Sequence, residues 1–94
     1  MGERVLVENT SSSLKRLLKK LGMKFTEEVG TSTLMQYRIS LTDEGLHLTR
    51  AANRQAEKDG VRAALFALHE RRLITILDED CSNSFKRALV EIVQ

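Results

Sequence analysis

The sequence predicts a small α+β domain with a mixed sheet and helices, in the order β-α-β-β-α-α-β-α. Three observations support this class. Leucines recur at helical spacing over residues 13–21, apolar and polar residues alternate over residues 33–41, and residues 73–77 (LITIL) form a short apolar run. The 94 residues fit a single domain, which we place at residues 1–94.

The first half of the chain is expected to hold a strand, a helix and a hairpin. Residues 4–8 (RVLVE) are rich in β-branched residues and predict the first strand. The helix over residues 13–21 is expected to end at Gly22 in a left-handed conformation. Residues 23–29 and 33–41 then predict two paired strands, joined by a turn at residues 30–32 (GTS).

Two helices are expected to follow this hairpin. Thr42 is a suitable N-cap for a helix whose buried stripe includes Leu48 and Ala56. The Asp59-Gly60 pair is expected to interrupt that helix, and a second helix is expected to follow it.

The end of the chain is expected to form a buried strand and a last helix. Residues 73–77 are apolar on both faces apart from Thr75, which is typical of an interior strand covered on both sides. Ser82 or Ser84 is expected to cap the last helix, which would bury Phe85 and Ile92.

Composition and charge limit the setting and the partners. With 41% hydrophobic and 30% charged residues, the chain has the composition of a globular protein, and no apolar run approaches the roughly 18 residues of a membrane span. The single cysteine, Cys81, agrees with a reducing compartment, and residues 1–10 lack the apolar core of a signal peptide. We therefore expect a cytoplasmic protein with no membrane partner.

The positive charge is concentrated near the start of the chain. Residues 1–26 carry six bases and two acids, a net charge of +4, whereas the rest carries nine bases and eleven acids, a net charge of −2. The exposed side of the first helix would carry four cations and no acid. An anionic partner is therefore expected to meet this helix.

A second basic stripe is expected on the helix that starts near Thr42. Its members would share one face at spacings of 0, 3, 7 and 11 residues, and they are His47, Arg50, Arg54 and Lys58. Two such stripes suit a phosphate backbone, because each neutralised phosphate adds salt-dependent affinity. The expected nucleic-acid-binding residues are Lys15, Arg16, Lys19, Lys20, Arg50 and Arg54.

The sequence gives little support for catalysis or for a metal site. Cys81 has no histidine near it in sequence, and His47 and His69 lie 22 residues apart with no clustered cysteine. The acidic residues 78–80 (DED) lack the spacing of a calcium loop, and no glycine-rich phosphate loop occurs. We therefore expect a non-enzymatic protein with no catalytic residue, no metal, no cofactor and no small-molecule substrate.

Residues 37–55 (YRISLTDEGLHLTRAANRQ) contain a strand that leads through Leu-Thr-x-x-Gly into an expected helix. Together with the basic helix and hairpin before it, this stretch resembles the recognition helix, wing and exit helix of winged-helix regulators of the MarR and PadR type. The resemblance covers residues 13–55. It implies that the cations of the first helix enter the major groove and that residues around Gly30 form the wing tip.

An alternative function is a protein–protein interaction module or adaptor. Residues 61–77 are broadly apolar for so small a chain. If one subunit does not cover both faces of the strand at residues 73–77, a homodimer or a partner protein must do so. The sequence therefore leaves DNA, RNA and protein open as partners, with regulatory nucleic-acid binding as the first expectation.

Overall fold

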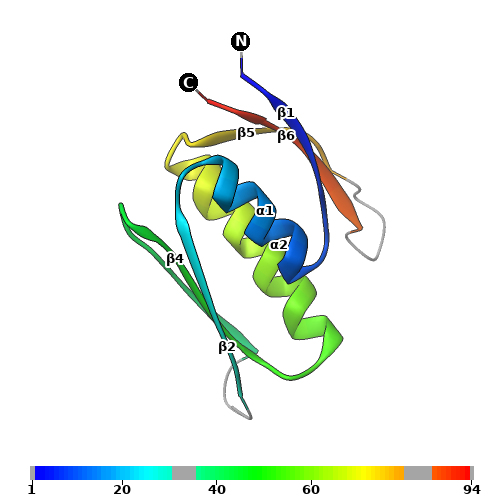
Figure 1. Ribbon diagram of the computed structural model, residues 1–94. Coiled ribbons are helices and arrows are strands. Elements are labelled where there is room, and N and C mark those ends of the chain that lie inside the picture. The colour runs from blue at the N-terminus through cyan, green and yellow to red at the C-terminus, as the bar shows by residue number, and fades with distance from the viewer. Residues whose placement is uncertain (1, 31–35, 80–85, 94) are drawn as a thin grey trace.

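The computed structural model describes residues 2–30, 36–79 and 86–93, and it has two helices and six strands there (Figure 1). The elements in chain order are β1 (Arg4–Glu8), α1 (Ser11–Lys20), β2 (Lys24–Gly30), β3 (Tyr37–Leu41), β4 (Gly45–Ala51), α2 (Arg54–Glu70), β5 (Ile74–Glu79) and β6 (Arg87–Ile92). The predicted α+β class is confirmed, while the order is β-α-β-β-β-α-β-β.

Two three-stranded sheets enclose the pair of helices between them (Figure 1). The first sheet has the order β1-β6-β5 and is antiparallel. The second sheet has the order β2-β4-β3, in which β2 runs parallel and β3 antiparallel to β4. Helix α1 packs against β1 and β2, whereas α2 packs against β3, β4 and β5. Each helix therefore lies between two edge strands, one from each sheet.

The core fills the space between the sheets, and its fully buried side chains come from both helices and from β1, β4, β5 and β6. Its fully buried leucines, isoleucine and valines are Leu14, Leu17, Leu18, Leu46, Leu48, Leu65, Leu68, Ile74, Val7, Val61 and Val90. The helix break predicted at Asp59-Gly60 is wrong, because both residues lie inside the continuous helix α2. A Cβ at Gly60 would come within 2.9 Å of a Leu48 methyl carbon. This glycine lets α2 approach β4 closely.

The predicted hairpin between β2 and β3 is wrong. These strands do not pair with each other, because β4 lies between them. The hairpin is instead β3–β4, closed by a turn in which the Thr42 N–H donates to the Gly45 carbonyl oxygen at 2.9 Å. Alternation of apolar residues identifies a strand but does not identify its neighbour. The predicted turn residues 31 and 32 lie outside the described residues.

The helix predicted from Thr42 is also wrong, because residues 45–51 form strand β4. Leu46 and Leu48 are buried, and His47 between them is half-exposed, which is the period of a strand. The wider series of small and apolar residues that contains Leu48 and Ala56 also fits helical spacing, so the periodicity was ambiguous. The helix begins only at Arg54, and Asn53 caps it by accepting a hydrogen bond from the Ala56 N–H at 2.8 Å.

Two predictions for the end of the chain are corrected as well. The LITIL segment contributes to β5, an edge strand in which Leu77 is 41% exposed, and β6 takes the central place in the sheet. The expected last helix is strand β6, in which alternate residues are buried. The predicted capping serines 82 and 84, Phe85 and Cys81 lie outside the described residues.

Candidate nucleic-acid interface

Helix α1 has well-defined signals at both ends. The Thr10 side-chain oxygen caps it by accepting a hydrogen bond from the Ser13 N–H at 3.2 Å. At the other end Gly22 has a φ of +72°, and the Met23 N–H donates to the Leu18 carbonyl at 2.9 Å. This left-handed glycine with a returning hydrogen bond is a Schellman motif. The helix and its glycine stop are as predicted from the sequence.

The buried side of α1 determines which residues face outward. Leu14, Leu17 and Leu18 are fully buried between the two sheets. The four predicted cations are all exposed on the opposite side of the helix, and we call them the α1 basic face: Lys15, Arg16, Lys19 and Lys20.

Few side chains in the described part of the chain contact this face. The Lys20 ammonium group lies 2.7 Å from a Glu3 carboxylate oxygen, and the Arg16 guanidinium donates to the Ser13 hydroxyl at 3.3 Å. Within residues 2–30, 36–79 and 86–93, Lys15 and Lys19 form no ion pair or side-chain hydrogen bond. Their charge is therefore available to an anionic ligand.

The second basic stripe does not exist as predicted, because its members lie on different elements. His47 and Arg50 belong to strand β4, whereas Arg54 and Lys58 belong to helix α2. Arg54 is exposed, at the first residue of α2. The structure therefore groups the four cations of α1 but does not place Arg50 and Arg54 on a shared helix face.

Arg50 belongs to a partly buried ionic network, which we call the Arg50 network: Arg50, Glu27, Glu57 and Ser11. The Arg50 side chain is 13% exposed; its Nε lies 2.7 Å from a Glu27 oxygen and its Nη2 4.0 Å from a Glu57 oxygen. The first residue of α1 joins them, because the Ser11 N–H donates to Glu57 at 2.9 Å and the Ser11 hydroxyl donates to Glu27 at 2.5 Å. The negative charge of these carboxylates interacts favourably with the positive end of the α1 helix dipole.

This network was missed at the sequence level because its members come from four elements. Glu27 and Arg50 meet only through the parallel β2–β4 pairing, which sets Glu27 beside Leu48 and Val29 beside Arg50. In the alternation of residues 23–29, Glu27 falls on the same side of the strand as Phe25. This position is the one sequence signal that Glu27 faces the core.

A second polar cluster lies on the outer face of the second sheet. The Thr26 hydroxyl lies 2.8 Å from His47 Nδ1, and His47 Nε2 lies 3.4 Å from a Glu28 oxygen. Hydroxyl, imidazole and carboxylate occur in this order in nucleophile relays. Here the His47 and Glu28 side chains are 42% and 69% exposed, so water competes for these contacts. We interpret the cluster as a surface hydrogen-bond network.

Two kinds of feature are absent from the described residues. No three His, Cys, Asp or Glu side chains of residues 2–30, 36–79 and 86–93 are grouped so that they could hold a metal ion. No helix in that same part of the chain is long and apolar enough to cross a membrane.

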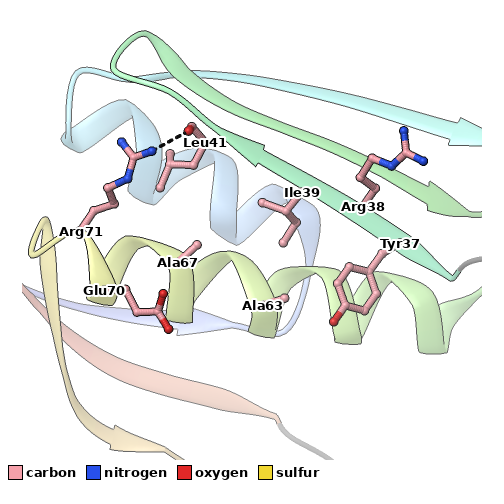
Figure 2. Close-up of a pocket in the computed structure, with 8 residues that line it drawn as sticks. All are labelled: Tyr37, Arg38, Ile39, Leu41, Ala63, Ala67, Glu70 and Arg71. Atoms are coloured by element: carbon pink, nitrogen blue, oxygen red, sulfur yellow. Dashed lines mark hydrogen bonds between the residues drawn. The ribbon is translucent and has the colours of Figure 1, made fainter.

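A groove with both apolar and charged lining lies between β3 and α2, on the opposite side of the helix layer from α1 (Figure 2). Around a volume of about 650 Å³ it is lined by Tyr37, Arg38, Ile39 and Leu41 from β3, by Ala63, Ala67 and Glu70 from α2, and by Arg71. The Arg71 guanidinium closes one end by donating to the Leu41 carbonyl at 2.9 Å. We call this the α2–β3 groove.

Comparison with known proteins assigns no function to the α1 basic face or to the α2–β3 groove. No protein-family model, curated protein or solved structure matches this chain. The resemblance of residues 13–55 to winged-helix regulators therefore stays a prediction.

Proposed function

We propose that this protein is a small regulatory domain that binds nucleic acid through the α1 basic face. The observation that carries the proposal is the set of four exposed cations on one helix, of which only Lys20 is ion-paired among the described residues. Each cation that neutralises a phosphate releases condensed counterions, and this release supplies most of the affinity of non-specific binding.

The composition of this face favours contacts with the phosphate backbone over the reading of bases. Three of its four residues are lysines, which act as compact point charges, and Arg16 alone offers a planar guanidinium that can contact guanine in two places. We therefore expect binding that depends weakly on sequence. Arg50 is not part of this proposal, because the Arg50 network already engages its guanidinium.

A charge-reversal experiment tests the proposal. The double variant Lys15→Glu/Lys19→Glu should lose nucleic-acid binding in a fluorescence-anisotropy titration with random duplex DNA and single-stranded RNA, while its circular dichroism stays unchanged. The matched control is Lys86→Glu/Arg87→Glu, which makes the same charge change at exposed residues at the start of β6. Equal loss of affinity in both variants would show that net charge, rather than the α1 basic face, determines binding.

A second candidate function is a protein-interaction module. The observation that favours it is the α2–β3 groove, beside which Phe66 is 40% exposed and Tyr37 is 36% exposed. If neither nucleic acid binds at low salt, this second function replaces the first.

A further inference from the structure

The outer face of the first sheet has an exposed apolar centre. The helices cover the inner face of this sheet (Figure 1), so alternate residues of β1 and β6 point to solvent on the outer face. Leu6 and Leu89 lie opposite each other there, and Leu6 is 53% exposed, the largest value among the large apolar side chains of the described residues. Val93, which follows β6, is 46% exposed. Covering these side chains would remove apolar surface from water and stabilise a complex.

A hollow lies beside the exposed Leu6 side chain on the same face. It has a volume of about 280 Å³ and is lined by Leu6, Leu89, Arg87 and Asp78. Asp78 belongs to edge strand β5 and lies opposite Leu89. The outer face therefore combines a projecting leucine with a recess that another leucine could fill.

Two pairs of opposite charges flank the two leucines. Arg4 lies opposite Glu91 on one side of the leucine pair, and Glu8 lies opposite Arg87 on the other side. The sign of the charge therefore alternates along each strand and also between the two strands. The Arg4 and Glu91 side chains, which lie 3.6 Å apart, are still 67% and 31% exposed, so both charges can meet a further partner.

We propose that a second copy of this chain packs on the outer face of the first sheet, with the two outer faces in contact. The two-fold axis would run parallel to the strands, between β1 and β6, so that β1 of each chain lies over β6 of the other. Leu6 then lies over the partner's Leu89 and enters the hollow of the partner, and the same contact occurs in the opposite direction. Sheets that pack face to face lie about 10 Å apart, and interlocking side chains fill that space.

The arrangement of charges is the reason that the occupant is a second copy. Under this two-fold axis, Arg4 faces the partner's Glu91. Glu8 likewise faces the partner's Arg87, so each of the four charges meets the opposite sign. An axis perpendicular to the strands through the leucine pair would also match these four charges, but it would set Asp78 against the partner's Asp78. The axis parallel to the strands leaves Asp78 outside the contact.

This dimer is independent of nucleic-acid binding. It covers the outer face of the first sheet, whereas α1 lies between the two sheets, against the inner face (Figure 1). A chain that dimerises without binding nucleic acid would contradict the proposed function alone, and a chain that binds nucleic acid but stays monomeric would contradict the dimer alone.

Mixing two charge variants tests this interface. Arg4→Glu alone sets acid against acid at two symmetric contacts, and Glu91→Arg alone sets base against base. Each variant should raise the dimer dissociation constant about tenfold or more in sedimentation equilibrium. An equimolar mixture of the two should form a heterodimer of about twice 10.6 kDa, since acid then meets base at both contacts.

Lys24→Glu is the matched control for Arg4→Glu. Lys24 is exposed and begins an edge strand of the second sheet, as Arg4 begins an edge strand of the first. The control makes the same change of net charge away from the interface, so it should dimerise like the wild type.

Native mass spectrometry identifies the heterodimer, because the two variants differ in mass. A variant that merely failed to fold would not be rescued by mixing, so the recovered heterodimer separates interface loss from misfolding. Because Arg87 is also changed in the control variant of the nucleic-acid experiment, the anisotropy titrations belong at protein concentrations at which the wild type is monomeric. Four results would overturn the proposal: a wild-type chain that stays monomeric at every concentration, single variants that dimerise like the wild type, a mixture that stays monomeric, or an equal loss of dimer in Lys24→Glu.

Discussion

Arg50 and Arg54 are four residues apart, yet their surroundings give them different roles. Arg54 is exposed at the start of α2, whereas Arg50 lies between two carboxylates in the Arg50 network. Removing a partly buried cation leaves Glu27 and Glu57 close together without a counter-charge. The resulting decrease in the free energy of unfolding depends on how much water reaches the two carboxylates.

Arg50→Met is therefore expected to destabilise the protein by about 1–3 kcal/mol, because both carboxylates lose their counter-ion in a site only partly open to water. Urea denaturation at neutral pH measures the change. Arg54→Met is the matched control and should stay within about 0.5 kcal/mol of the wild type, as for most surface changes. Equal stability of the two variants would contradict the structural role of the Arg50 network.

At the scale of the element, α1 carries two separate sets of side chains in ten residues. Its leucines anchor it between the sheets, and its cations face outward. The two sets of side chains can therefore be changed separately. A substitution on the buried side is expected to change stability, and under the proposed function a substitution on the exposed side is expected to change nucleic-acid binding.

Leu18→Ala should cost about 2–4 kcal/mol of the free energy of unfolding, because it removes a fully buried side chain and leaves a cavity. Lys19→Ala, one residue later, should change that free energy by less than about 0.5 kcal/mol. Thermal and urea unfolding of both variants measure the difference. A small effect of Leu18→Ala would mean that α1 does not pack as described.

The elements with unambiguous local signals could be predicted from the sequence, and the others could not. Helix α1 has a cap, a leucine stripe and a glycine stop, and β1 has a β-branched run, so both were predicted correctly. The residues of β4 fit two periods at once, because Leu46 and Leu48 alternate while Leu48 and Ala56 also match a helix. The pairing of β2 with β4 joins segments across the intervening β3, which no local pattern specifies.

The parts of the candidate site also differ in whether the sequence predicts them. The α1 basic face follows from one helical stripe, so its four residues could be identified in advance. The α2–β3 groove and the Arg50 network need contacts between elements that are distant in the chain. The predicted stripe through His47 and Arg54 did not form, because the helix on which it depended is a strand in its first half.

At the scale of the whole molecule, the two helices give the protein two different faces. Helix α1, which carries the basic face, packs against edge strands β1 and β2, and the α2–β3 groove lies beside edge strand β3.

The central claim is that the α1 basic face binds nucleic acid through phosphate neutralisation, and the salt dependence of the affinity tests it most directly. Fluorescence anisotropy of duplex DNA between about 50 and 200 mM salt should give a slope of log K against log salt of about −3 per bound chain, since three to four cations act. Lys19→Ala should reduce the magnitude of that slope by about 1. A slope near zero, or no binding at low salt, would contradict the account.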